Sequence, residues 1–206
     1  MLAQLKSAAL QGVDSYIVEV EVNLTSGLPA FSVVGLPEGA VREGRERVMA
    51  ALENAGYAVP PRKITVNLAP ADVRKSGSAF DLPIALGLLV GMGVIPAEAL
   101  VGTVVVGEVS LDGTLRPVRG ALSMTERAGT DGLRGIVLPR QNAPEAALVP
   151  GLSVLGAETL TEVVGHFRRE EPIPETRIDP SAMLAAPPDR RLDLSDVRGQ
   201  EHVKRA

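Results

Sequence analysis

The stretch ITVNLAPADVRKSGSAFDLPIALGLL, residues 64–89, contains two elements around which the rest of the chain can be arranged. Lys63 to Leu68 alternates polar and apolar residues, which predicts a half-buried strand. Ser78 and Asp81 then form an S-x-x-D helix start, with Ser78 expected as the N-cap. The run that follows, to Gly91, is apolar nearly all round, so we expect a buried helix.

The residues before this stretch predict a strand pair and a helix. Tyr16 to Leu24 (YIVEVEVNL) alternates valine with glutamate, and Pro29 to Gly35 (PAFSVVG) is also typical of a strand. Because only a short turn separates them, we expect a hairpin. Pro37 begins a helix that Gly56 ends. On that helix Arg42, Arg45 and Arg47 are interleaved with Glu43 and Glu46, which favours a solvated, salt-bridged face.

The residues after this stretch alternate strands and helices. We expect a strand at Thr103–Val109, a turn, a short strand at Leu115–Val118, and then helix, strand, helix, strand and helix at Gly120–Ala128, Gly135–Leu138, Ala143–Leu148, Ser153–Leu155 and Leu160–Phe167. From Arg168 prolines and charges replace the periodic pattern, which is typical of a linker. The fold class expected from this order is α+β.

Composition excludes several classes of protein. The 206 residues include no cysteine and carry a formal net charge of −4. Disulfides and thiolate metal sites are therefore excluded, and a reducing compartment is indicated. Residues 1–12 lack the pattern of a signal peptide, and the apolar run Leu82–Ile95 is too short and too broken for a membrane span. We expect a cytoplasmic protein with no membrane partner.

Four stretches in order resemble the ComM/YifB family of magnesium chelatase-like AAA+ ATPases. They are FSVVGLPEGAVREGRERVMAALENAGY (31–57), ITVNLAPADVRKSGSAFDLPIALGLL (64–89), GEVSLDGTLRPVRGAL (107–122) and DLSDVRGQEHVKRA (193–206). The resemblance implies a Lon-protease-like domain of the ribosomal-protein-like second-domain superfamily, with a mixed sheet and flanking helices. It also implies a part in a hexameric helicase that drives branch migration during DNA recombination and natural transformation.

The resemblance divides the chain into three parts. Residues 1–167 resemble the Lon-protease-like domain, 168–192 the linker, and 193–206 the start of the AAA+ module. In that last part Asp196, Val197, Gly199 and Gln200 are expected near the nucleotide. No Gly-rich phosphate loop followed by Lys and Ser/Thr occurs in the chain. We therefore expect no cofactor here, but ATP and Mg in a full-length protein, with its own motor domain and a homo-hexamer as partners.

The Lon resemblance raises the alternative of a serine–lysine peptidase. Alignment on the family motifs places Ala79 at the nucleophile and Leu122 at the lysine, and neither side chain can do that chemistry. A shift of one residue would place Ser78 there instead, with Ser76 and Lys75 close in sequence. Since the segment 120–124 offers no lysine, we expect a non-catalytic accessory domain. Whether this chain has any enzymatic activity of its own stays open.

Other residues offer weaker candidates. Arg62, Lys63, Arg74 and Lys75 flank the strand segment Ile64–Leu68 and could converge at one end of the sheet to contact phosphates of branched or single-stranded DNA. The alternative is a solvated loop surface, because no aromatic residues accompany them for base stacking.

The remaining titratable residues favour structural roles. His166 and His202 are too isolated for a metal site, so we expect none. Asp72 is expected in a turn and Asp81 at a helix N-terminus. A magnesium chelatase subunit is kept as a further alternative, although no residue pattern favours it.

Overall fold

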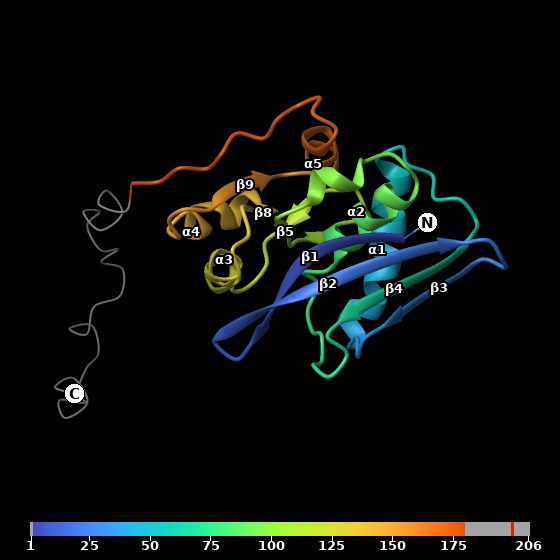
Figure 1. Cartoon of the computed structure of the whole chain (residues 1–206), viewed down its shortest axis with the longest axis horizontal. Coiled ribbons are helices and arrows are strands. Elements are labelled where there is room, and N and C mark those ends of the chain that lie inside the picture. The colour runs from blue at the N-terminus through green and yellow to red at the C-terminus, as the bar shows by residue number, and fades with distance from the viewer. Residues whose placement is uncertain (1, 180–198, 200–206) are drawn as a thin grey trace.

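In the computed structural model, a seven-stranded mixed sheet is flanked by helices (Figure 1). The structure describes residues 2–179 and 199. The strands of this sheet follow the order β3-β4-β2-β1-β5-β8-β9. Their bounds are β1 Leu2–Gln11, β2 Asp14–Thr25, β3 Ala30–Val34, β4 Lys63–Ala69, β5 Thr103–Val105, β8 Gly135–Pro139 and β9 Ser153–Ala157. A two-stranded sheet holds β6 Glu108–Val109 and β7 Leu115–Arg116.

The helices lie near the expected places. The α-helices are α1 Gly39–Asn54, α2 Asp81–Gly91, α3 Ala121–Thr130, α4 Ala143–Ala146 and α5 Leu160–Phe167, with 3-10 turns at Ala97–Leu100 and Arg140–Asn142. Every residue of α2 is buried, as its apolar sequence predicts. The α+β class with a mixed sheet and flanking helices is therefore confirmed.

The first strands pair differently from the expected hairpin. β2 pairs in antiparallel register with β1 on one side and with β4 on the other, while β3 pairs in parallel with the far side of β4. The hairpin predicted between residues 16–24 and 29–35 is thus wrong. The true hairpin joins β2 to β1, a strand that the sequence analysis missed because its alanines and serine give a weak alternating pattern.

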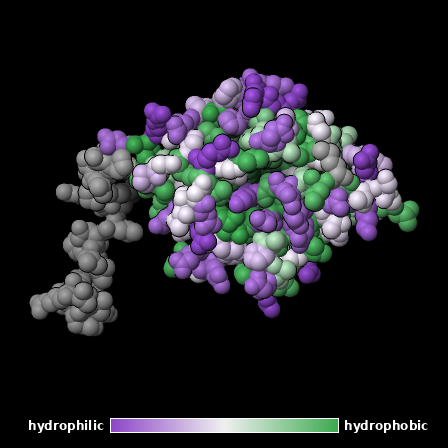
Figure 2. Space-filling model, in the orientation of Figure 1, coloured by the Kyte–Doolittle hydropathy of each residue, from purple (hydrophilic) through white to green (hydrophobic). Residues whose placement is uncertain are grey.

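The sheet separates two apolar cores. Val20 and Val22 of β2 face α1 and α2, in a core that also includes α5. Val104 of β5 and Ile136 of β8 face α3 and α4 in the second core. The second core does not cover β3, β4 or the part of β2 that pairs with β4. On these strands the face of the sheet that points away from α1 and α2 is polar. There Glu21 accepts hydrogen bonds from Gln4 (3.0 Å) and Asn67 (2.8 Å), and on the face in view hydrophilic side chains are interspersed with apolar ones (Figure 2).

The strand expected at 103–109 is broken at Gly107. Its first part, β5, belongs to the large sheet and its second part, β6, to the small one. Between them the Gly107 amide donates to the carbonyl of Ala79, and the Gly107 carbonyl accepts from Leu82 at 3.0 Å. A Cβ on Gly107 would lie 3.1 Å from the Leu82 side chain. The chain therefore leaves the sheet here to pack closely against the start of α2.

Packing continues beyond Phe167, where the linker was expected to begin. Ile173 is buried, its amide donates to Nδ1 of His166 at 3.0 Å, and Thr176 donates to the carbonyl of Val154 at 2.8 Å. The remainder of the expected linker, and the AAA+ stub apart from Gly199, lie outside the described residues. Within residues 2–179 no helix is long and apolar enough to cross a membrane.

Candidate functional site

A hollow lies between the end of β1 and the start of α2. It has a volume of about 410 Å³ and is formed by the end of β1, the loop before α2, the start of β6 and the approach to α3. Ser76, Ser78 and Ala79 come from the loop, Glu108 from β6 and Arg119 from the turn before α3. Apolar residues supply much of the remaining wall, namely Ala8, Ala9, Leu10, Phe80, Pro117, Val118 and Met124.

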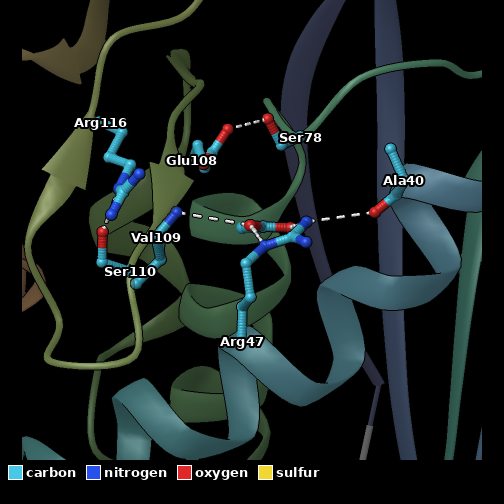
Figure 3. A network of polar contacts seen from close by, with 8 residues as sticks. Ala40, Arg47, Ser78, Glu108, Val109, Ser110 and Arg116 are labelled. Carbon is cyan, nitrogen blue, oxygen red and sulfur yellow. Dashed lines mark hydrogen bonds and ion pairs between the residues drawn. The ribbon is translucent and has the colours of Figure 1, made fainter.

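Ser78 is not the N-cap of α2, contrary to expectation. The helix begins at Asp81, its N-cap is Phe80, and no side chain caps it. The Ser78 hydroxyl instead donates to the carboxylate of Glu108 across the hollow (Figure 3). The prediction failed because the S-x-x-D pattern says nothing of Glu108, which is 30 residues away in the chain.

Lys75 is not placed to activate Ser78. Its side chain is fully buried, and Nζ donates to the backbone carbonyls of Pro70 and of Val73, the latter at 2.7 Å. Burial lowers the pKa of Lys75, and the charge of Asp72 opposes that shift. The ammonium thus holds the loop at residues 70–75 closed. This also corrects its assignment as a possible phosphate contact, because no part of the side chain reaches the surface.

The two positions of the expected dyad lie in different surroundings. Ala79 is partly buried and lines the hollow, whereas Leu122 is 43% exposed on α3 and does not line it. Neither carries a group that can transfer a proton. The serine and the carboxylate in the hollow form a hydrogen-bonded pair, and Arg119 adds a positive charge at the rim without an ion-pair partner among residues 2–179.

An ion pair between a partly buried arginine and a buried carboxylate lies beside this hollow. Arg47 of α1 donates from Nε to Asp81 at 2.7 Å and from a terminal nitrogen at 3.0 Å, and the same nitrogen reaches the carbonyl of Ala40 at 3.1 Å (Figure 3). The Asp81 carboxylate also accepts a long hydrogen bond, 3.4 Å, from the backbone amide of Val109. The expectation that Arg47 belongs to a solvated face is therefore wrong. Arg47 ties α1 to Asp81 at the start of α2, and Asp81 in turn accepts from Val109 of β6.

Desolvation dominates the titration of Asp81. Its carboxyl is 1% exposed, and burial raises its pKa to about 6, although the hydrogen bonds and the charge of Arg47 oppose the rise. The Arg47 pKa is raised by its hydrogen bonds to the same carboxylate. Gly44 makes this geometry possible, because a Cβ there would lie 2.4 Å from an Asp81 oxygen. A glycine inside a helix was the available sequence signal for a close approach.

The four basic residues proposed for DNA do not converge. Arg62 and Lys63 lie at the start of β4, whereas Arg74 and Lys75 follow its end, so the length of the strand separates the two pairs. Arg74 is exposed and instead lines a second hollow, of about 510 Å³, with Arg42 at the start of α1. Contact with DNA at Arg62, Lys63 and Arg74 stays a prediction.

The remaining candidates have structural contacts or lie outside the described residues. His166 is half-buried, accepts from Ile173, and burial lowers its pKa. Asp72 lies in a turn, as expected. In the part of the chain that the structure describes, no group of three or more His, Cys, Asp or Glu could hold a metal ion. His202 and the nucleotide-site candidates Asp196, Val197 and Gln200 lie outside that part, and Gly199 is described without its neighbours.

Comparisons with known proteins place these features in a family. The family described as subunit ChlI of Mg-chelatase matches residues 20–142. Competence protein ComM of Haemophilus influenzae is 41% identical over 206 residues, all of this chain and 40% of its own length. YifB of Escherichia coli is 39% identical over 204 residues, 99% of this chain and 39% of its own length. The chain thus spans about two fifths of these relatives.

A more distant similarity agrees with the fold. Lon protease 2 of Bacillus subtilis is 22% identical over 169 residues, covering 73% of this chain. This similarity is compatible with the mixed sheet and its flanking helices.

Proposed function

Because this chain belongs to the Mg-chelatase-like family that includes ComM and YifB, we propose that it acts as the non-catalytic N-terminal accessory domain of an AAA+ ATPase. Its part is assembly of a hexamer or engagement of branched or single-stranded DNA, in recombination of the kind that the name competence protein suggests. ATP and Mg would bind to the motor of the full-length protein. The expected location is the cytoplasm.

The observation that carries the proposal is the side-chain set of the hollow at Ala79. A serine nucleophile needs a base within hydrogen-bond reach. Ser78 donates to Glu108, and the nearest lysine in sequence, Lys75, donates to two backbone carbonyls. A Ser–Lys dyad therefore has no support among the residues that line the hollow.

A peptidase assay separates the proposal from its main alternative. The chain is incubated with unfolded β-casein, and cleavage is compared for the native sequence, Ser78→Ala and Glu108→Gln. We expect no cleavage above background from any of the three. Cleavage that Ser78→Ala abolishes would establish a serine peptidase and overturn the proposal.

The chelatase alternative has little support from the described residues. They hold no group of three or more His, Cys, Asp or Glu that could bind a metal, and the family match names a subunit of Mg-chelatase without naming an activity. Magnesium insertion into protoporphyrin by the full-length protein, lost on substitution within residues 2–179, would favour it.

DNA engagement is supported by Arg42 and Arg74, which line one hollow and form no ion pairs among residues 2–179. Gel shift with forked DNA tests it on the native chain and on Arg42→Glu/Arg74→Glu. The matched control is Arg62→Glu/Lys63→Glu, at the other end of β4 with the same change of charge. We expect both double variants to bind more weakly, with the larger loss, at least tenfold, and a shallower salt dependence for Arg42→Glu/Arg74→Glu. Equal losses would indicate nonspecific attraction, and no binding by the native chain would leave assembly as the role.

A further inference from the structure

The sheet has one covered edge and one open edge. At β9 the chain covers its own sheet, because Glu175 bridges to Leu155 and the Thr176 amide donates to the Val154 carbonyl at 2.8 Å. At the other end, β3 pairs only with β4. Apart from that ladder, its one backbone hydrogen bond in the described part of the chain joins Ala30 to Arg62, next to β4. The outer side of β3 is therefore unpaired, as its place at the margin of the sheet shows (Figure 1).

This edge lacks the charges that usually protect an exposed strand. No residue from Val22 to Pro37 is charged. Large apolar side chains are exposed along it, with Val34 46%, Leu36 50% and Leu28 88% exposed. Edge strands in monomeric proteins are normally interrupted by lysine, proline or a bulge. Here Pro29 stands at one end, and Ala30–Val34 is free to accept another strand.

We propose that β3 pairs with β3 of a second copy of this chain, antiparallel about a two-fold axis at Ser32. In this register Ala30 lies opposite Val34 of the partner subunit, and Phe31 lies opposite Val33 of the partner subunit. Ser32 lies opposite its own copy. Each cross-strand pair is then apolar with apolar or hydroxyl with hydroxyl, and no like charges meet.

The strand's own sequence selects this occupant and this register. If the register shifted by one residue, residues from opposite faces of the two strands would be paired, and Ser32 would lie opposite an apolar residue. The helix beside the edge presents both signs of charge, since Arg45 lies 5.7 Å from the centre of the Phe31 ring and 3.5 Å from Glu46. A two-fold copy therefore meets no surface of a single sign.

The contact is distinct from the ring of motors in the proposed function. A two-fold contact uses the same patch on both chains and closes on two copies, whereas a ring needs two different patches. The inference therefore stands or falls independently of the accessory role. A strand of five residues spans only about 17 Å, so contact through this edge buries little surface and the pairing is weak.

Sedimentation of the 206-residue chain tests the pairing. Between about 0.01 and 1 mM we expect the weight-average mass to rise from 21.5 kDa towards twice that value. Ser32→Lys and Ser32→Glu each place like charges at the axis, so each should weaken association at least tenfold. An equimolar mixture of the two should regain it, because opposite charges then face each other. Gln4→Lys is the control and should associate like the native chain, because Gln4 lies on the same polar face but on β1, with β4 and β2 between it and β3.

Cross-linking gives a second readout that does not depend on affinity. The chain has no cysteine, so Ser32→Cys introduces a single thiol. Directly opposed residues of antiparallel strands have Cβ atoms about 4.5–5.5 Å apart, and a small shift of the two strands brings them to the roughly 3.5–4.5 Å that a disulfide spans. We expect Ser32→Cys to dimerise under mild oxidation at least tenfold faster than Thr25→Cys, an exposed control on β2. A monomer at every concentration, together with equal rates for the two variants, would overturn the proposal, as would native association by Ser32→Lys.

Discussion

Arg47→Met tests how much the ion pair with Arg47 offsets the free-energy cost of burying the Asp81 carboxylate. The variant keeps much of the aliphatic stem but removes both hydrogen bonds to a carboxyl that is 1% exposed. Leaving one partner of a buried pair alone costs about 3–5 kcal/mol. The protein can limit this cost by protonating Asp81, whose usual pKa is 3.8. Each pH unit above that value adds about 1.4 kcal/mol, so at pH 7.5 the ionised Asp81 costs the variant at most about 5 kcal/mol, of which the native chain, with a pKa of about 6, already carries about 3 kcal/mol.

The same reasoning makes the cost depend on pH. In the native chain the pKa of Asp81 is already about 6, so lowering the pH from 7.5 to 5 stabilises it by about 1.4 kcal/mol. Without Arg47 the pKa lies higher still, and the same change stabilises the variant by about 3.4 kcal/mol once that pKa exceeds 7.5. The destabilisation should therefore shrink by about 2 kcal/mol at pH 5.

Urea denaturation followed by circular dichroism at the two pH values measures both quantities. Arg45→Met is the control, on the same helix but with an exposed side chain and an exposed partner, Glu46. It should cost no more than about 1 kcal/mol at either pH. If Arg47→Met costs less than about 1 kcal/mol at pH 7.5, or costs the same at both pH values, Arg47 does not offset the burial of the ionised Asp81 and the reasoning is refuted.

Three further substitutions examine the same region. Asp81→Asn should flatten the pH dependence of stability. Because the folded pKa of Asp81 is raised, the native chain loses up to about 3 kcal/mol of stability as pH rises from about 4 to 6. A variant whose denaturation midpoints keep the native slope against pH would count against this. Gly44→Ala should destabilise by about 1–3 kcal/mol in thermal unfolding, since its Cβ would lie 2.4 Å from Asp81; Gly39→Ala, with open space around it, should be neutral or slightly stabilising. Lys75→Met removes two hydrogen bonds to buried-loop carbonyls and should cost about 2 kcal/mol, whereas Lys63→Met on the surface should change the unfolding midpoint little.

The sequence located much of the candidate site but not its contacts. The loop with Ser76, Ser78 and Ala79 could be placed before α2, because a strand, a glycine and an apolar helix follow one another there. Glu108 and the pair between Arg47 and Asp81 could not be found. Their partners are 30 and 34 residues away, and nothing in either segment specifies the other.

Local pattern determined which residues form most strands and helices, which faces they bury, and the family to which the chain belongs. Secondary structure and buried faces depend on neighbours within one or two turns, whereas the family resemblance depends on four stretches that occur in order along the chain. Only the tertiary structure decided that β3 joins β4 rather than β2, that β1 completes the sheet, and that Lys75 is buried. The reason is that strand partners and buried charges are selected by contacts between distant segments, whose packing is settled by the whole chain at once.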